Sequence, residues 1–328
     1  AMSPNLDFLA VTNEGADLVA FLDIDPSSPT FHTVVESTIV GTGPTGITWE
    51  SANEDIFVCN QAEGTVSVIS GFTLKVRKTL QNQLSRPIEV ALTPRQFLFG
   101  FARGVYFGYV LNQNGNVAVF ESGPDGVNGF GFDNIISTLP FKFLRPKAMQ
   151  VDPTNLNSGV WIVHEHPLDE LGNDSGQGGG AVSNVGISGG LVGIVPLDPG
   201  PFSNPQIREL EFSVLAWFGT GPRGLSGIPV DIAFDNLRNL TALTNYGTTF
   251  SPGNPLSYNG KSLVKVVTVP ISTTAPQFMF LAVPNPGVID VFDLTSGSFE
   301  RVDTNPFTSG FQSIPVPNAT VLADYFRQ

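Results

Sequence analysis

The chain has 328 residues, and its 29 acidic and 16 basic side chains give a net charge of −13 at pH 7. Charged residues make up only 14% of the sequence, beside 35 Gly and 26 Pro, which argues against helical bundles and coiled coils. Hydrophobic residues at 41% are enough to build a core and argue against disorder. Because nucleic acids and anionic membranes attract a basic face, we expect neither as a partner of this acidic chain.

Cysteine content and hydrophobicity exclude further kinds of site and structure. Cys59 is the single cysteine, which excludes an internal disulfide and a multi-cysteine zinc site. It lies in the apolar run Ile56–Cys59, so we expect a buried thiol with no catalytic role. No apolar run reaches the roughly 18 residues of a membrane helix, so we expect no membrane insertion.

A short apolar phrase that ends in Asn recurs along the chain. In chain order its copies occupy residues 9–13, 57–60, 109–112, 242–245 and 282–285, and a degenerate copy ending in His-Glu occupies residues 162–165. Turn residues follow the phrase, as at Glu63-Gly64 and Asn114-Gly115. These turns are typical of β-hairpins, so each phrase is expected to be a strand that enters a hairpin.

Further strands are expected on both sides of the phrase. Alternating segments rich in β-branched and aromatic residues follow it, at residues 18–23, 66–69, 117–120, 264–267 and 289–293. A proline and a short apolar segment precede it, at residues 44–49, 87–92, 146–153 and 229–235. Three or four strands in roughly 45 residues, repeated about six times, are typical of a β-propeller. A two-sheet sandwich is the alternative, but it does not predict one phrase at near-constant spacing.

The repeats therefore predict an all-β fold, with a single β-propeller domain of about six blades over residues 1–328. Five blades are the alternative if one is degenerate, because residues 270–277 are too few for two full strands. Seven result if the long interval between residues 165 and 245 contains another blade. Since the chain begins on a phrase strand, residues 311–316 and 319–326 are expected to join the first blade and close the ring.

Residues 56–94 resemble the YVTN-type β-propeller repeat of bacterial surface and periplasmic proteins. The Tyr-Val-Thr-Asn tetrad of that family stands here as Phe57-Val58-Cys59-Asn60, and its Val-Ser-Val-Ile follows unchanged at residues 66–69. The Gly-Pro-x-Gly-Ile strand of the family matches residues 43–47. The resemblance covers residues 8–94 well and most of the chain loosely. It implies a propeller fold and a secreted, periplasmic or cell-surface location, and it implies no activity.

Two insertions interrupt the repeat, at residues 164–190 and 246–260. Both follow a phrase strand, so both are expected on the same rim of the propeller. Insertions in repeat folds often lie on the face that carries the functional site. The second insertion carries Tyr246, Phe250 and Tyr258, which are candidates for ligand binding because aromatic rings stack on ligands.

The first insertion combines His164, Glu165, His166, Asp169 and Asp174. Histidine and carboxylate ligands at this density could bind zinc or another divalent metal, and the carboxylates could bind calcium. His-x-His without a third ligand at a defined spacing is a weak pattern, and the EF-hand pattern is missing. A solvated loop is the commoner explanation, and no other cofactor is predicted.

Three functions fit these observations. The favoured one is an exported, non-catalytic propeller that binds a protein, a glycan or a small ligand on the insertion-bearing rim. The second is a metal-dependent hydrolase or lyase at the channel mouth, which resembles in outline the propeller lyases that act on cyclic antibiotics. The third is a structural module of a larger surface protein. The sequence leaves open whether the protein is an enzyme and favours a non-enzyme.

Overall fold

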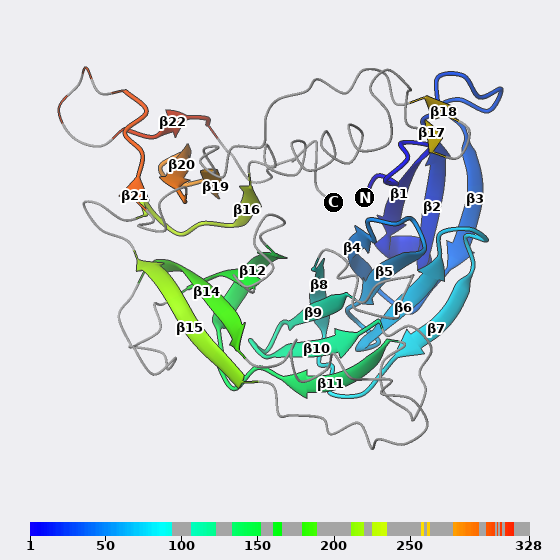
Figure 1. Ribbon diagram of the computed structural model, residues 1–328, viewed down its shortest axis with the longest axis horizontal. Helices are drawn as coiled ribbons and strands as arrows, with labels where there is room; N and C mark the ends of the chain where they lie inside the picture. The colour runs from blue at the N-terminus through cyan, green and yellow to red at the C-terminus, as the bar shows by residue number, and fades with distance from the viewer. Residues whose placement is uncertain are drawn as a thin grey trace. The chain divides into compact units, whose positions relative to one another are not determined.

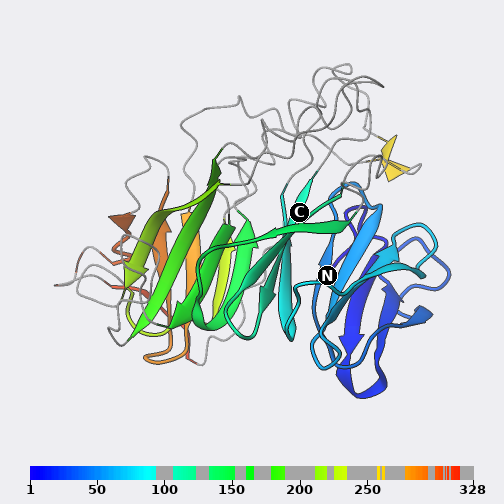
Figure 2. The ribbon, with the colours of Figure 1, turned by 90° about the horizontal axis from the view of Figure 1, so that it is seen from below.

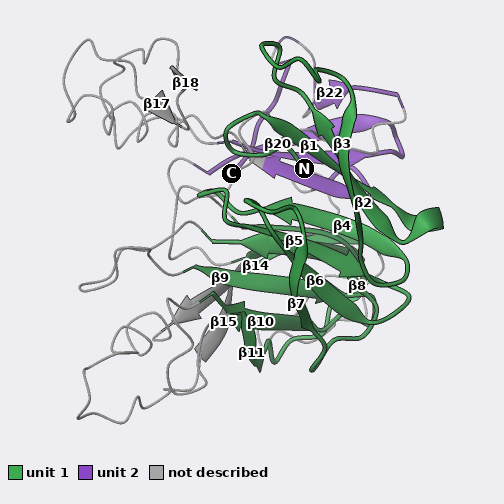
Figure 3. Cartoon of the chain, turned by 90° about the vertical axis from the view of Figure 1, so that its right-hand side faces the viewer, with its two compact units in different colours: residues 1–219, 328 green, residues 220–327 purple. Residues whose placement is uncertain are grey.

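The computed structural model describes residues 1–93, 106–122, 133–151, 160–165, 179–188, 211–219, 225–234, 257–258, 261–262, 278–294, 300–305, 307, 309 and 312–317. Within these ranges the regular structure is β, apart from the short 3-10 turn η1 (Glu14–Ala16). The chain divides into two compact units, unit 1 with residues 1–219 and 328, and unit 2 with residues 220–327 (Figure 3). Among the described residues, no helix has the length and hydrophobicity needed to cross a membrane.

Unit 1 contains four antiparallel sheets whose strands follow one another in chain order (Figure 1). The first sheet has three strands, β1 (Phe8–Asn13), β2 (Leu18–Asp23) and β3 (Val34–Ile39). The second has four, β4 (Pro44–Trp49), β5 (Asp55–Asn60), β6 (Thr65–Ser70) and β7 (Val76–Leu80). The third has β8 (Pro87–Leu92), β9 (Phe107–Asn112), β10 (Val117–Glu121) and β11 (Asn134–Thr138). The fourth has β12 (Leu144–Val151), β13 (Val160–Glu165), β14 (Gly180–Ser188) and β15 (Glu211–Gly219).

The repeated phrase forms the same strand in each sheet. It is β5, β9 and β13 in the four-stranded sheets, where it lies second, and it is β1 in the first sheet. Each of these strands pairs antiparallel with the next strand in the chain, as the hairpin signals predict. Seen from below, most strands of unit 1 are steeply inclined, and one teal strand runs nearly horizontally across them (Figure 2). The predicted blade pattern is therefore confirmed.

Strand β5 explains why the phrase is continuously apolar. All six of its residues are buried. Phe57 and Cys59 pack in a cluster with the third sheet, whereas Ile56 and Val58 pack with Phe21 of the first sheet. Successive side chains of a strand point to opposite faces, so a strand covered on both faces needs apolar residues at every position. The predicted burial of Cys59 is confirmed, and burial raises the pKa of its thiol well above the usual range.

The first strands of neighbouring sheets lie close together. Thr48 Oγ1 on β4 donates a hydrogen bond to the Val90 carbonyl on β8, at 2.6 Å. Glu89 on β8 accepts one from the Met149 backbone N–H on β12, also at 2.6 Å. A Cβ atom at Gly46 would collide with a backbone carbonyl of β8. This crowding explains why the strands that follow proline are built from small and apolar residues.

Unit 2 contains one sheet ordered β16 (Asp231–Phe234), β19 (Phe278–Val283), β20 (Val288–Asp293) and β21 (Glu300–Arg301). Strand β22 (Ile314–Pro315) also pairs with β20, and β17 (Ser257–Tyr258) pairs with β18 (Lys261–Ser262) in a separate two-stranded ladder. The phrase at residues 282–285 again ends a second strand, β19. Five blade-like sheets lie in the described residues, and the phrase at residues 242–245, on which a sixth blade depends, lies outside them.

The expectation that residues 311–316 join the first blade is wrong for Ile314 and Pro315. These residues pair with Val288 and Ile289 of β20 in their own sheet. The reason is local, because β21 pairs only with the far end of β20 and leaves the rest of that edge open to β22. In the first sheet, Met2 forms a bridge with Leu9 on the edge of β1. Residues 319–326 lie outside the described residues.

Candidate functional site

The asparagines that end the phrase are structural. Asn60 donates from Nδ2 to the hydroxyls of Thr65 and Ser67, both at 2.9 Å. Asn112 accepts a hydrogen bond from the Ser85 backbone N–H at Oδ1, at 2.8 Å. The hydrogen bonds of Asn60 fix the β5–β6 hairpin. The hydrogen bond of Asn112 connects the β9 hairpin to the chain that enters β8. The rim formed by these hairpins is thus ordered by its own repeated motif.

His164, the first predicted metal ligand, lies in the core. Its side chain is fully buried, with Nε2 at 2.8 Å from the Ser183 hydroxyl and Nδ1 at 3.1 Å from the Glu165 carbonyl oxygen. The ring also meets the edge of Phe143, with centroids 5.2 Å apart. His164 occupies the strand position of Cys59 in β5, which is equally buried. Alignment of the phrases could have revealed this structural role from the sequence.

Glu165 is bound by two cations on the neighbouring strand β12. Its carboxylate lies 2.9 Å from Arg145 Nη1 and 3.3 Å from Lys147 Nζ. Burial raises the pKa of Glu165, but the hydrogen bonds from Arg145 and Lys147 outweigh burial and hold this pKa below its usual range. The carboxylate therefore stays ionised and paired at neutral pH.

The other predicted site residues lie mostly outside the described residues. This applies to His166, Asp169, Asp174, Tyr246 and Phe250. Tyr258 lies in β17, where it pairs with Lys261 of β18. In the part of the chain that the structure describes, no three His, Cys, Asp or Glu side chains are grouped as a metal would require. The metal and aromatic sites in the insertions stay predictions.

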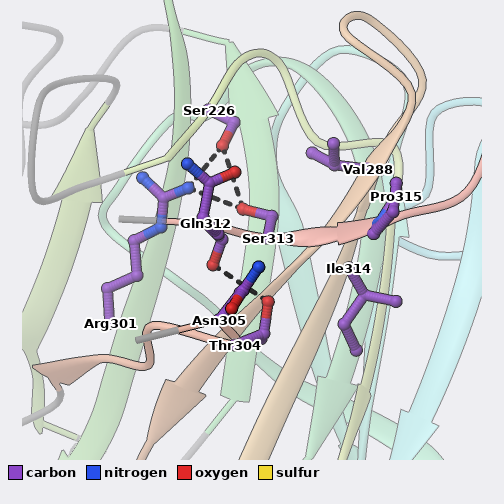
Figure 4. Close-up of a pocket in the computed structure, with 9 residues that line it drawn as sticks. All are labelled: Ser226, Val288, Arg301, Thr304, Asn305, Gln312, Ser313, Ile314 and Pro315. Carbon is purple, nitrogen blue, oxygen red and sulfur yellow. Dashed lines mark hydrogen bonds between the residues drawn. The ribbon is translucent and has the colours of Figure 1, made fainter. Parts of the chain in front are cut away.

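A pocket that the sequence did not reveal lies in unit 2, with a volume of about 590 Å³ (Figure 4). It forms where the outermost strand of the sheet is split into β21 and β22, and the chain between these strands supplies one wall. We call it the β20 pocket. Its lining consists of Ser226, Val288, Arg301, Thr304, Asn305, Gln312, Ser313, Ile314 and Pro315.

A buried ionic network supports the polar side of the β20 pocket. The Asp290 carboxylate accepts hydrogen bonds from the backbone N–H and the hydroxyl of Ser226, both at 2.7 Å, and from the Ser313 hydroxyl at 2.5 Å. Arg301 Nη2 lies 3.1 Å from Asp290 Oδ1 and donates to both serine hydroxyls at 2.6 Å. Asp290 is fully buried, and the Arg301 side chain is 7% exposed. We call Ser226, Asp290, Arg301 and Ser313 the Arg301 cluster.

The lining of the β20 pocket is mainly polar. Among the described residues, its lining contains no His or Cys, and its two serine hydroxyls are held by Asp290 and Arg301. An activated serine needs an adjacent general base, usually a histidine, and the lining supplies none. The pocket offers hydroxyl and amide groups beside three aliphatic side chains.

A second buried ionic network lies in unit 1, between the second and third sheets. Arg77 of β7 donates from Nε to Asp55 at 2.8 Å and from Nη2 to Asp133 at 2.5 Å. The Tyr106 hydroxyl donates to the other Asp55 oxygen at 2.9 Å. Burial raises the pKa of Asp133 to about 6, although the charge of Arg77 opposes this shift. We call Asp55, Arg77, Tyr106 and Asp133 the Arg77 cluster.

One sequence motif resembles the pattern around a catalytic serine. Residues 186–190 read Gly-Ile-Ser-Gly-Gly, which matches the Gly-x-Ser-x-Gly pattern of a nucleophile elbow. An elbow needs a sharp turn from a strand into a helix. Here Ser188 ends β14 and pairs with Glu211 of the antiparallel strand β15. The residues that follow Ser188 lie outside the described residues, so the motif stays a match of sequence alone.

Comparison with known proteins identifies the fold. No family model and no curated protein matches the sequence. A 6-phosphogluconolactonase-like protein from Bacteroides uniformis is 12% identical, with a TM-score of 0.50 over 96% of this chain and 70% of that protein. The chain is a β-propeller. Hydrazine synthase from Kuenenia stuttgartiensis is 11% identical, with a TM-score of 0.45 over 97% of this chain and 86% of its own.

Proposed function

We propose that this β-propeller is an exported, non-catalytic binding protein of the YVTN-type group whose ligand is a glycan or another small molecule. The β20 pocket carries the proposal. Its volume of about 590 Å³ falls in the range of about 300–1,000 Å³ that small-ligand sites occupy, and its lining combines aliphatic with polar side chains. Export is supported by the match of residues 43–69 to the YVTN repeat and by the near absence of cysteine.

The contacts of His164 support binding over metal-dependent catalysis. A metal bound at either ring nitrogen would displace the Ser183 hydroxyl or the Glu165 carbonyl oxygen from a buried hydrogen bond. Losing a buried hydrogen bond costs about 1–3 kcal/mol, which metal binding would have to offset. Glu165 would in addition have to leave Arg145 and Lys147.

The test separates binding from turnover. The full chain would be screened by thermal shift against a panel of glycan fragments and small metabolites, and each hit would be followed by NMR overnight. We expect a stabilising hit that is recovered unchanged, because the pocket lacks a nucleophile with a base. Conversion of a hit into product would contradict the proposal.

Metal content gives an independent control. Elemental mass spectrometry would be run on untagged protein and on a His166→Ala variant. His166 is the better choice for this variant because replacing His164 would also remove a buried contact with Ser183. We expect substoichiometric metal in both proteins. One equivalent of a divalent metal in the parent protein, lost in the variant, would favour the hydrolase or lyase instead.

A further inference from the structure

We infer that the β20 pocket binds a neutral, hydroxyl-rich ligand of the mono- or disaccharide class. This inference rests on the proposed binding function and adds the chemical class of the ligand. Three properties of the pocket support it, namely its charge balance, its amide and hydroxyl wall, and its aliphatic wall.

The charge balance disfavours ionic ligands. Arg301 is the one charged side chain among the described lining residues, and its positive charge is matched by Asp290 at 3.1 Å. Asp303 lies in the same wall, where its Oδ1 accepts the backbone N–H groups of Asn305 at 3.0 Å and Gln312 at 3.1 Å. A phosphate or carboxylate would approach two acidic side chains and an arginine already bonded to one of them. A cation would find Asp290 fully buried and covered by its own donors, and Asp303 already accepting two backbone N–H groups.

The polar wall presents groups that suit hydroxyls. Gln312 is exposed, and its side-chain amide has no hydrogen-bond partner among the described residues. Figure 4 shows this amide pointing away from Thr304 and toward Ser226. Thr304 Oγ1 donates to the Gln312 carbonyl at 3.1 Å, which holds the two residues side by side. An amide offers donors and an acceptor together, and a sugar hydroxyl can pair with either.

The opposite wall is aliphatic. Val288, Ile314 and Pro315 lie across the pocket from Arg301 in Figure 4. Ile314 is 38% exposed, so its side chain is available to a ligand. A sugar ring has C–H groups on its faces and hydroxyls around its edge, so it can cover an aliphatic wall while it bonds to an amide wall. A fully apolar ligand would leave the Gln312 amide unpaired, at the desolvation cost of a lost hydrogen bond.

The experiment is calorimetric titration of the full chain with neutral and charged sugars. Maltose, cellobiose and chitobiose are the neutral probes, and gluconate and glucose 6-phosphate are the charged ones. We expect at least one neutral probe to bind, and both charged probes to bind at least about tenfold more weakly, in line with about 1.4 kcal/mol of electrostatic cost. Gln312→Ala should lower the affinity for the neutral probe about three- to tenfold, as loss of one or two hydrogen bonds predicts.

Gln113→Ala is the matched control, because Gln113 is an exposed glutamine in unit 1. It should leave the affinity unchanged, and the thermal midpoint of each variant verifies folding. Charged sugars that bind as tightly as neutral ones would overturn the ligand class and leave the binding function standing. Neutral binding that is insensitive to Gln312→Ala would overturn the assignment to this pocket. If no sugar binds but the thermal screen finds another ligand that is recovered unchanged, the inference is overturned and the proposed function stands. If the thermal screen finds a ligand that the protein converts, the proposed function is overturned.

Discussion

The Arg77 cluster and the Arg301 cluster are two ways of pairing an arginine with buried carboxylates. Arg77 faces two carboxylates, Asp55 and Asp133, whereas Arg301 faces one carboxylate, Asp290, and two serine hydroxyls. The first cluster joins the second and third sheets of unit 1. The second lies within the sheet of unit 2, beneath the β20 pocket.

The difference lies in net charge and in what each cluster leaves accessible. The Arg77 cluster has one carboxylate more than it has cations, and Asp55 and Asp133 are 3% and 1% exposed, so its carboxylates are closed to ligands. In the Arg301 cluster the charges cancel, and Ser226, Arg301 and Ser313 also line a pocket. The comparison indicates that a buried ion pair between sheets acts in stability, whereas a balanced pair under a split strand can support a binding surface.

Removing the Arg77 guanidinium should have the largest effect. Arg77→Met leaves Asp55 and Asp133 buried together without their cation, and breaking a buried pair in this way costs about 3–5 kcal/mol. The free energy of unfolding can be measured by urea denaturation with tryptophan fluorescence. Trp49, Trp161 and Trp217 all belong to unit 1, so this signal reports on the unit that contains the cluster.

Lys75→Met is the control for Arg77→Met. Lys75 pairs with Glu36 at 3.0 Å, but its side chain is 59% exposed. Exposed pairs contribute only about 0–1 kcal/mol, so this variant should unfold almost as the parent does. Equal effects of the two variants would show that the Arg77 cluster does not stabilise the contact between sheets.

Arg301→Met should lower the free energy of unfolding of unit 2 by about 1–3 kcal/mol, which is less than the effect of Arg77→Met. The loss is smaller because Asp290 keeps its hydrogen bonds from Ser226 and Ser313. Hydrogen exchange of residues 278–294, followed by mass spectrometry, measures the loss in unit 2. Arg145→Met is the matched control, since Arg145 is 76% exposed in its pair with Glu165. A loss of stability in Arg301→Met larger than that in Arg77→Met would show that the Arg301 cluster contributes more to stability than the Arg77 cluster.

The repeated elements could be predicted from the sequence because their signals are local. The phrase, its turn and its alternating partner lie within one hairpin, so the positions of β5, β6, β9 and β10 follow from short-range patterns. The error at β22 has the opposite cause. Whether Ile314 pairs with its own sheet or with the first one depends on which edge is open, and no local pattern encodes an open edge.

The two clusters and the pocket could not be predicted for the same reason. Arg77 and Asp133 are separated by 56 residues, and Ser226 and Asp290 by 64. Their meeting depends on how sheets and split strands pack, which the residue types do not reveal. His164 shows the converse case, because a residue that resembles a ligand in the sequence occupies a core position of the repeat.

The smallest predicted effect is a pH dependence that distinguishes the clusters. Burial, aided by Asp55 and opposed by Arg77 and Lys78, raises the pKa of Asp133 to about 6 from an ordinary 3.8. Between these values the folded state holds a proton that the unfolded state has released. The contribution of Asp133 to stability should therefore fall as the pH rises from about 4 to about 6, by about 1 kcal/mol per pH unit at most.

Asp133→Asn removes this titration, so the free energy of unfolding of the variant should rise more steeply with pH than that of the parent protein over the same interval. Urea denaturation at pH 4, 5, 6 and 7 measures the difference in slope. Glu36→Gln provides a control of opposite sign, because hydrogen bonding to Lys75 lowers the pKa of Glu36 and its contribution is lost as the pH falls. Parallel curves for Asp133→Asn and the parent would show that Asp133 ionises in the ordinary range. Arg77 would then offset the whole burial cost of the Asp133 carboxylate, and the extra carboxylate of this cluster would have no pH-dependent effect on stability to distinguish it from the Arg301 cluster.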